Sequence, residues 1–153
     1  MPTKQNKTKK PAKKTKKKKA SKEAYIYALG RRKQASARVR LYINKKGGIT
    51  VNGKPIEEYF PGRVLKSLYV EPLRTCNVIG KYAISAKIKG SGKKGQLGAF
   101  IHGVSRALEK LNTERFRPIL KKRGFLTRDP RKKERRKPGT GGKARRQKQS
   151  PKR

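Results

Sequence analysis

Positive charge dominates this chain of 153 residues, a length that suits one ordinary domain. Lys and Arg supply 47 residues against 8 Asp and Glu, so the formal net charge is +39. Because self-repulsion of this size opposes compaction, we expect a polyanion whose phosphates neutralise the cations and release condensed counterions. Nucleic acid is therefore the expected partner.

Several other classes of protein are excluded by what the sequence lacks. Cys76 is the only cysteine and His102 the only histidine, so neither an internal disulfide nor a typical zinc site is expected. No apolar segment of the signal-peptide type follows the cationic start, and no apolar stretch is long enough to cross a membrane. We expect a cytoplasmic protein with no metal, no cofactor and no membrane partner.

Composition divides the chain into three regions. Residues 1–23 are rich in Lys and poor in apolar residues, so they cannot bury enough surface to offset chain entropy, which predicts a disordered arm. Residues 24–126 hold nearly all of the large apolar residues and are expected to form one globular domain. Residues 127–153 are again basic, which predicts a long extended tail that folds only on its partner.

Strands are predicted by short β-rich or alternating runs at residues 25–29, 37–43, 49–51 and 81–88. Within residues 37–43, the alternation gives one buried face, which includes Ile43, and one cationic face. Turns are expected at Gly47-Gly48 and at Asn52-Gly53.

Helices are predicted between and after these strands. A short one should follow Pro55, and a second should start at Arg63, with Pro72 ending or kinking it. A last helical turn or two should stop at Gly124. Strands interspersed with helices indicate an α+β two-layer sandwich. The apolar positions expected on the second helix are Val64, Leu65 and Leu68, and those on the strongest helix, which should start near Gln96, are Leu97, Phe100, Ile101, Val104, Ala107, Leu108 and Leu111.

A glycine-rich segment from Gly90 to Gly95 matches the G-x-G-x-x-G spacing of a dinucleotide site. The acid that such a site needs, about 20 residues on at the end of a strand, is missing, because Glu109 and Glu114 fall on or just after a predicted helix. Glycines still let backbone approach an anion closely, and a helix start offers free N–H groups. We therefore expect Lys93 and Lys94 to contact RNA phosphates; the alternative is a plain flexible loop.

A second basic cluster, from Gly30 to Arg38, places Arg31, Arg32, Lys33 and Arg38 beside small residues between two predicted strands. Small neighbours allow close approach to a phosphate backbone, and Arg can bind phosphate with two parallel hydrogen bonds. The alternative is a solvated surface turn.

Catalysis is not expected from the candidate residues. Glu57 and Glu58 are sequence neighbours that point in different directions on a helix, which makes them a poor acid/base pair. Cys76 has no signature of a reactive thiol and is more typical of a small buried residue. His102 lies on the strongest predicted helix, where packing or a surface position is favoured.

The chain resembles the ninth small-subunit ribosomal protein family, in its bacterial form, over about residues 25–153. The most specific blocks are Gly103 to Leu108 and Thr127-Arg128-Asp129-Pro130-Arg131. Others are Gly30 to Lys33 with Ala37-Arg38-Val39, Asn52-Gly53 with Tyr59-Phe60, Gly90 to Gln96, Gly98-Ala99, and Glu134-Arg135.

This resemblance implies a fold like the second domain of ribosomal protein S five, with a left-handed crossover, and a structural role in translation. It implies binding to the 3′ domain of the small-subunit ribosomal RNA in the head of the subunit, beside other head proteins and without homo-oligomerisation. The tail would thread through this RNA and end on peptidyl-site transfer RNA. Ribosomal RNA contacts are expected at Arg31, Arg32, Lys33, Arg38, Lys93, Lys94, Arg106, Arg128, Arg131, Arg135, Arg136, Arg145 and Arg146, and transfer RNA contacts at Lys152 and Arg153.

Three features depart from the family pattern. Ser91 stands where the glycine-rich loop usually has a glycine, Ser150-Pro151 precedes the terminal Lys-Arg where an aromatic residue is usual, and the Lys-rich arm before Ala24 is an addition. Two rival functions are a linker-histone-like DNA packager and a nucleotide-binding protein. The Arg-rich tail with Asp129 and Glu134 disfavours the first, and the missing acid disfavours the second.

Overall fold

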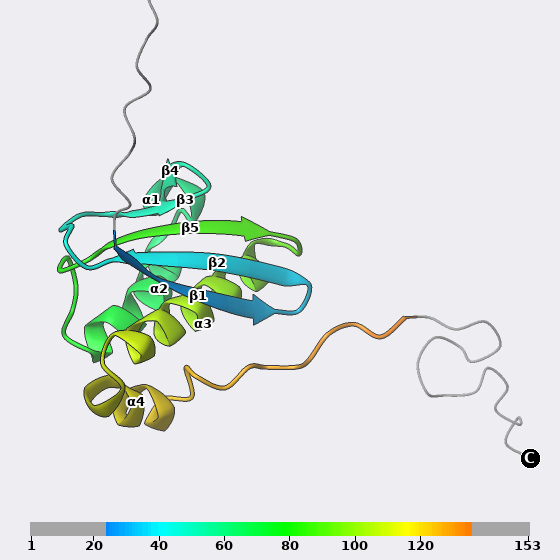
Figure 1. Cartoon of the computed structure of the whole chain (residues 1–153). Helices are drawn as coiled ribbons and strands as arrows, with labels where there is room; N and C mark the ends of the chain where they lie inside the picture. Colours follow the sequence, from blue (N-terminus) through cyan, green and yellow to red (C-terminus); the bar gives the residue numbers. More distant parts are fainter. Residues whose placement is uncertain (1–23, 136–153) are drawn as a thin grey trace, which may run out of the picture.

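The computed structural model describes residues 24–135 and contains one five-stranded sheet and four α-helices (Figure 1). This mixed architecture is the α+β class expected from the sequence. The elements are β1 (Tyr25–Arg32), β2 (Ala35–Tyr42), β3 (Ile49–Val51), β4 (Lys54–Pro55), α1 (Ile56–Tyr59), α2 (Arg63–Thr75), β5 (Ala83–Lys89), α3 (Lys93–Leu111) and α4 (Thr113–Lys122).

The strands lie in the order β1-β2-β5-β3-β4, and every neighbouring pair is antiparallel except β3 and β5. The parallel pair is joined through α1 and α2, which form a crossover connection; its expected left-handedness stays a prediction. Within each long strand the residues alternate between buried and more exposed positions, so only one face of the sheet belongs to the core.

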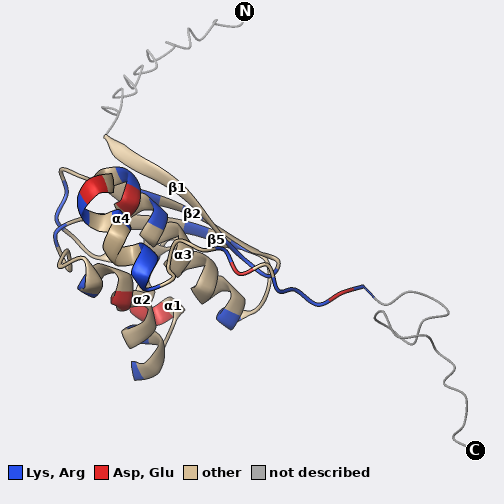
Figure 2. Cartoon of the chain, turned by 90° about the horizontal axis from the view of Figure 1, so that it is seen from below, with Lys and Arg blue, Asp and Glu red and all other residues tan. Residues whose placement is uncertain are grey.

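Helix α3 covers the buried face of β1 and β2, and α2 and α4 pack against α3 (Figures 1 and 2). Its apolar stripe follows the predicted helical spacing, and Leu97, Phe100, Val104, Ala107 and Leu108 are all buried. Ile101 and Leu111, from the same predicted stripe, are partly buried against the core. The sequence pattern therefore identified the face of the longest helix correctly.

Small residues set the distance between α3 and the sheet. A Cβ atom on Gly30 would collide with the Ala99 carbonyl oxygen and with the Gly103 backbone nitrogen. A Cβ on Gly103 would lie 2.7 Å from a methyl group of Val39. The helix backbone therefore lies directly on β1. The small residues near Gly30, which were expected to admit phosphate, contribute to this packing instead, because Ala35 and Ala37 are buried together with Gly30.

The first hairpin is longer than expected. β1 continues through Arg32 and β2 begins at Ala35, so that only Lys33 and Gln34 form the turn. The cations that were expected in a connection between strands therefore stand on the strands, with Lys33 alone at the tip. Its φ of 51° is a left-handed conformation that suits a tight turn.

Other expected boundaries and burials also differ. Helix α2 does not end at Pro72 but continues to Thr75, so of the two expected effects of this proline only the kink stays a prediction. Helix α3 begins at Lys93 rather than near Gln96. The side chains of Ile43, Val64 and Leu68 are 42%, 73% and 39% exposed, so these positions are not part of the core.

We expect Gly30→Ala to lower the free energy of unfolding by about 3 kcal/mol, because the new methyl group would force α3 away from β1. Gly48→Ala is the matched control, since a methyl group there meets no atom within 4 Å. Urea denaturation of both variants provides the measurement. Equal stabilities would contradict the packing described for α3.

Candidate nucleic-acid interface

Three segments that are far apart in the sequence meet beside the β1–β2 hairpin. The glycine-rich loop packs on the hairpin turn, where a Cβ on Gly90 would collide with the Gln34 carbonyl oxygen. The Arg32 side chain runs across Gly98 of α3 and forms an ion pair with Asp129, in the segment that follows α4. The sequence predicted each segment to be basic, but not that they adjoin.

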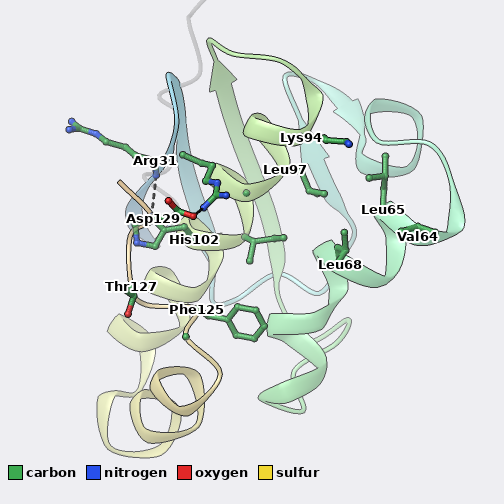
Figure 3. A pocket seen from close by; sticks show the side chains of 14 residues that line it. Arg31, Val64, Leu65, Leu68, Lys94, Leu97, His102, Phe125, Thr127 and Asp129 are labelled. Atoms are coloured by element: carbon green, nitrogen blue, oxygen red, sulfur yellow. Dashed lines mark hydrogen bonds and ion pairs between the residues drawn. The ribbon is translucent and has the colours of Figure 1, made fainter. Parts of the chain in front are cut away.

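A groove of about 440 Å³ opens at this junction between α2, α3 and the segment after α4 (Figure 3). Its lining includes Arg31, Arg32 and Lys94 together with the exposed apolar side chains of Val64 and Leu68. Figure 3 shows the Arg31 side chain pointing away from Lys94 and from the apolar residues. Arg31 and Lys94 therefore present their charges in different directions.

A polar network fixes the glycine-rich loop before α3 begins. The Gln96 side-chain amide donates to the carbonyl oxygens of Gly90 and Ser91, at 3.2 and 3.5 Å, and its oxygen accepts from the Tyr59 hydroxyl at 2.9 Å. The Asn52 amide donates to the Tyr59 hydroxyl and to the Ile88 carbonyl. These hydrogen bonds hold the loop in one conformation. The sequence predicted the Asn-Gly turn and the glycine-rich segment separately, but not the hydrogen bonds that connect them.

The loop ends in a backbone that suits an anion. Gly90 and Ser91 have φ of 80° and 57°, and Gly92 is the N-cap of α3, with no side chain bonded to the first-turn N–H groups. Ser91 occupies a left-handed conformation that glycine adopts without strain. The first turn of α3 therefore keeps free donors and the positive end of the helix dipole.

The two lysines of the glycine-rich loop differ in what they contact. The Lys93 ammonium donates to the Tyr59 carbonyl oxygen at 3.1 Å and lies 3.9 Å from the centre of the Tyr59 ring. Lys94 is exposed and lines the groove. Lys93 is therefore partly engaged in holding α1 to α3, and Lys94 is the better placed of the two to meet an external phosphate.

A row of side chains on α3 covers the free edge of β1. The Arg106 guanidinium donates to the Leu29 carbonyl oxygen at 2.7 Å, and the Lys110 ammonium donates to the Tyr27 carbonyl oxygen at 3.0 Å. One turn before Arg106, His102 Nδ1 accepts from the Arg31 backbone N–H at 3.2 Å. These contacts protect an edge strand that would otherwise expose unpaired backbone groups, a role that sequence reasoning did not assign to Arg106 or to His102.

His102 also joins the segment after α4 to the domain, through a hydrogen bond with the Leu126 backbone. Burial is the main cause that lowers the pKa of His102, and the nearby Arg106 and Arg128 charges lower it further. The imidazole is thus held neutral, as its acceptor role toward the Arg31 N–H requires.

We expect the protein to lose stability as pH falls from about 7.5 to 5.5, with the loss beginning near the ordinary histidine pKa of about 6.5. A base whose pKa is lowered by folding binds more protons in the unfolded state, so acid favours unfolding. His102 is the only histidine, so His102→Gln should flatten the dependence over this range. Denaturant unfolding at several pH values measures it, and an unchanged slope in the variant would contradict the assignment.

Asp129 fastens the segment after α4 to the hairpin. Its carboxylate accepts from Arg131 Nε at 3.1 Å, from Arg131 Nη2 at 2.7 Å and from the Arg131 backbone N–H at 2.9 Å, and it pairs with Arg32. The Arg131 side chain first, then the Arg131 backbone and Arg32, hold the pKa of the Asp129 carboxyl well below its usual range. The lone acid of the Thr-Arg-Asp-Pro-Arg block thus positions two of the expected RNA-binding arginines.

Asp129→Asn should loosen residues 127–131 without unfolding the sheet, because charge-assisted hydrogen bonds are about twice as strong as neutral ones. Faster amide hydrogen exchange in this segment, with unchanged exchange in β1 and β2, is the expected result. Glu134→Gln is the matched control, since it removes one negative charge from the same exposed stretch. Equal protection of residues 127–131 in the two variants would rule out that Asp129 fastens this segment to the hairpin.

The remaining predicted contact residues are distributed as follows. Lys33 is exposed at the hairpin tip, and Arg128 and Arg135 are exposed in the segment after α4. Arg38 projects from the face of the sheet opposite α3 and so is not part of this junction. Arg136, Arg145, Arg146, Lys152 and Arg153 lie outside the described residues.

The candidate catalytic residues are engaged in ion pairs or buried in the core. Glu57 pairs with Lys66 at 2.6 Å, whereas Glu58 pairs with Lys54 at 2.7 Å, so the two carboxylates are engaged separately. Cys76 is buried, and burial raises the pKa of its thiol, the opposite of what a nucleophile needs. Within residues 24–135 no helix could span a membrane, and no group of His, Cys, Asp and Glu is arranged to hold a metal ion.

Comparison with known proteins settles the family. The model of the family described as ribosomal protein S9/S16 matches residues 30–153. The chain belongs to this ribosomal protein family. It is 50% identical over 118 residues to the small ribosomal subunit protein uS9 of Maridesulfovibrio salexigens, covering 77% of this chain and 89% of that protein.

A second relative gives the same assignment. The chain is 49% identical over 114 residues to small ribosomal subunit protein uS9 of Anaeromyxobacter sp. (strain K), covering 74% of this chain and 86% of that protein. Membership of the S9 family makes the chain a structural, non-enzymatic component of the small subunit of the bacterial ribosome, acting in translation in the cytoplasm. This family is not that of either rival.

Proposed function

We propose that the chain binds the 3′ domain of the small-subunit ribosomal RNA in the head of the subunit and contacts peptidyl-site transfer RNA through its tail. One observation carries the first part: three basic segments converge at the hairpin, around the Arg32–Asp129 ion pair. Lys33, Lys94 and Arg128 are exposed there. Phosphate contacts of this kind position a protein on folded RNA without reading its sequence.

The direction of the chain after Asp129 supports the second part of the proposal, the contact of the tail with transfer RNA. Residues 127–135 form no helix or strand; the segment passes the hairpin at Asp129 and then leads away from the sheet and the helices (Figure 1). From Thr127 to Arg153 the chain could span roughly 90 Å if fully extended at about 3.3 Å per residue. The Asp129 contacts would therefore fix where a long basic thread leaves the domain.

The proposed transfer RNA contact rests on Lys152 and Arg153, two cations at the end of this thread. Such side chains can hold backbone phosphates without regard to sequence, which suits a site that must accept every transfer RNA. The partners are then ribosomal RNA, transfer RNA and neighbouring head proteins, with a single copy of the chain in each subunit.

Deleting Lys152 and Arg153 should weaken transfer RNA binding in the peptidyl site by about tenfold at low salt, because the deletion removes two cations that can neutralise phosphates. Incorporation into small subunits, measured by co-sedimentation at high salt, should stay unchanged. The control variant carries Gln149→Ala and Ser150→Ala, which alters the same end but keeps both charges. Unchanged transfer RNA binding at matched salt would refute the tail contact, and failure of the full-length protein to co-sediment would refute the whole proposal.

A further inference from the structure

The face of the sheet that points away from α3 carries cations and tyrosines and no acid. Alternation along the strands places Ala28, Val39 and Ile88 in the core, so their sequence neighbours project from the opposite face. This open face, as we call it, is formed by β1, β2 and β5. Its charged and aromatic members are Tyr25, Tyr27, Arg31, Arg38, Arg40, Tyr42, Lys87 and Lys89.

Strand register brings like charges together on the open face. Arg38 lies directly opposite Lys87, and Lys89 lies opposite Ser36, two residues further along the same pair of strands. Directly opposed like charges destabilise a sheet by a few tenths of a kcal/mol or more. None of the ion pairs among residues 24–135 involves these cations. An external anion would therefore relieve a repulsion that the folded domain itself leaves in place.

The aromatic rings distinguish between possible anions. The side chains of Tyr25 and Tyr27 are 46% and 44% exposed, next to each other on the open face of β1. Tyr25 and Tyr42 have ring centres 5.9 Å apart, and the Arg40 guanidinium lies 5.1 Å from the Tyr25 ring centre. Tyr27 has no ring or cation contact of this kind among the described residues. Exposed aromatic rings between cations on a sheet provide stacking surfaces for unpaired bases as well as charges for phosphates.

We propose that the open face binds an unpaired stretch of RNA, with a base stacked on Tyr27 and phosphates held by Arg38, Lys87 and Lys89. This inference rests on the proposed RNA-binding function and adds a second surface to it. The open face and the groove lie on opposite faces of the sheet, because Arg32 points toward α3 whereas Arg38 points away from it; only Arg31, on the edge strand, belongs to both sets. The domain would thus hold RNA on both sides of one sheet.

The test uses the full-length protein with two labelled RNAs of one sequence, a single strand of twelve nucleotides and its blunt duplex. Fluorescence anisotropy over a range of salt gives the affinities and the salt slopes. Lys87→Gln with Lys89→Gln should reduce the salt slope for the single strand by about 1.4, because each phosphate that is no longer neutralised reduces it by about 0.7. The matched control, Lys121→Gln with Lys122→Gln, removes two exposed cations from α4 and should leave the slope within about half a unit.

A second pair of variants isolates stacking. Tyr27→Thr should weaken single-strand binding by about tenfold and leave duplex binding unchanged, whereas Tyr27→Phe, which keeps the ring, should bind both RNAs as the wild type does. Unchanged thermal unfolding confirms that each variant is folded. Open-face variants that behave like the α4 control would overturn the inference but leave the proposed function standing. Displacement of the single strand by polyglutamate as readily as by unlabelled RNA would also overturn it, whereas absence of wild-type RNA binding would overturn both.

Discussion

The close contact between α3 and the β1–β2 hairpin is the constraint on which the rest of the structure depends. Gly30 and Gly103 allow the helix backbone to lie on the strand without a side chain between them. At this distance Arg106 and Lys110 reach the carbonyl groups on the free edge of β1. Close packing and protection of the strand edge therefore both follow from the absence of side chains where helix and strand cross.

The same contact determines where the basic segments meet. Because α3 lies along the hairpin, its first turn and the glycine-rich loop come to the hairpin turn, where Gly90 touches Gln34. After α4 the chain returns past His102, and Asp129 pairs with Arg32 on the same hairpin. An acid in a strongly basic block is informative for this reason, since its carboxylate can form charge-assisted hydrogen bonds that fasten cationic segments to each other without a phosphate.

Much of the fold could be predicted from periodicity, whereas contacts between distant residues could not. The α3 stripe and the alternation of residues 37–42 follow directly from local spacing, although the predicted burial of Ile43 was wrong. The register that opposes Arg38 and Lys87 depends on how strands pair, which no local pattern records. The exposure of Val64 follows from the position of α2 beside the groove. The sequence does not show which helix packs against the small residues near Gly30, so their role in packing against α3 could not be predicted.

Acids are distributed unevenly among the elements of this domain, whereas cations are found on helices and strands alike. The helices carry acids that pair with nearby cations, as in Glu71 with Arg123 and Glu109 with Arg117. The strands carry cations and no acid. Surface ion pairs contribute little individually, and because the helices still carry more Lys and Arg than Glu, these pairs neutralise only part of the charge on the helices. The open face, the hairpin and the segment after α4 add further cations, so neutralisation of the excess positive charge has to come from another molecule.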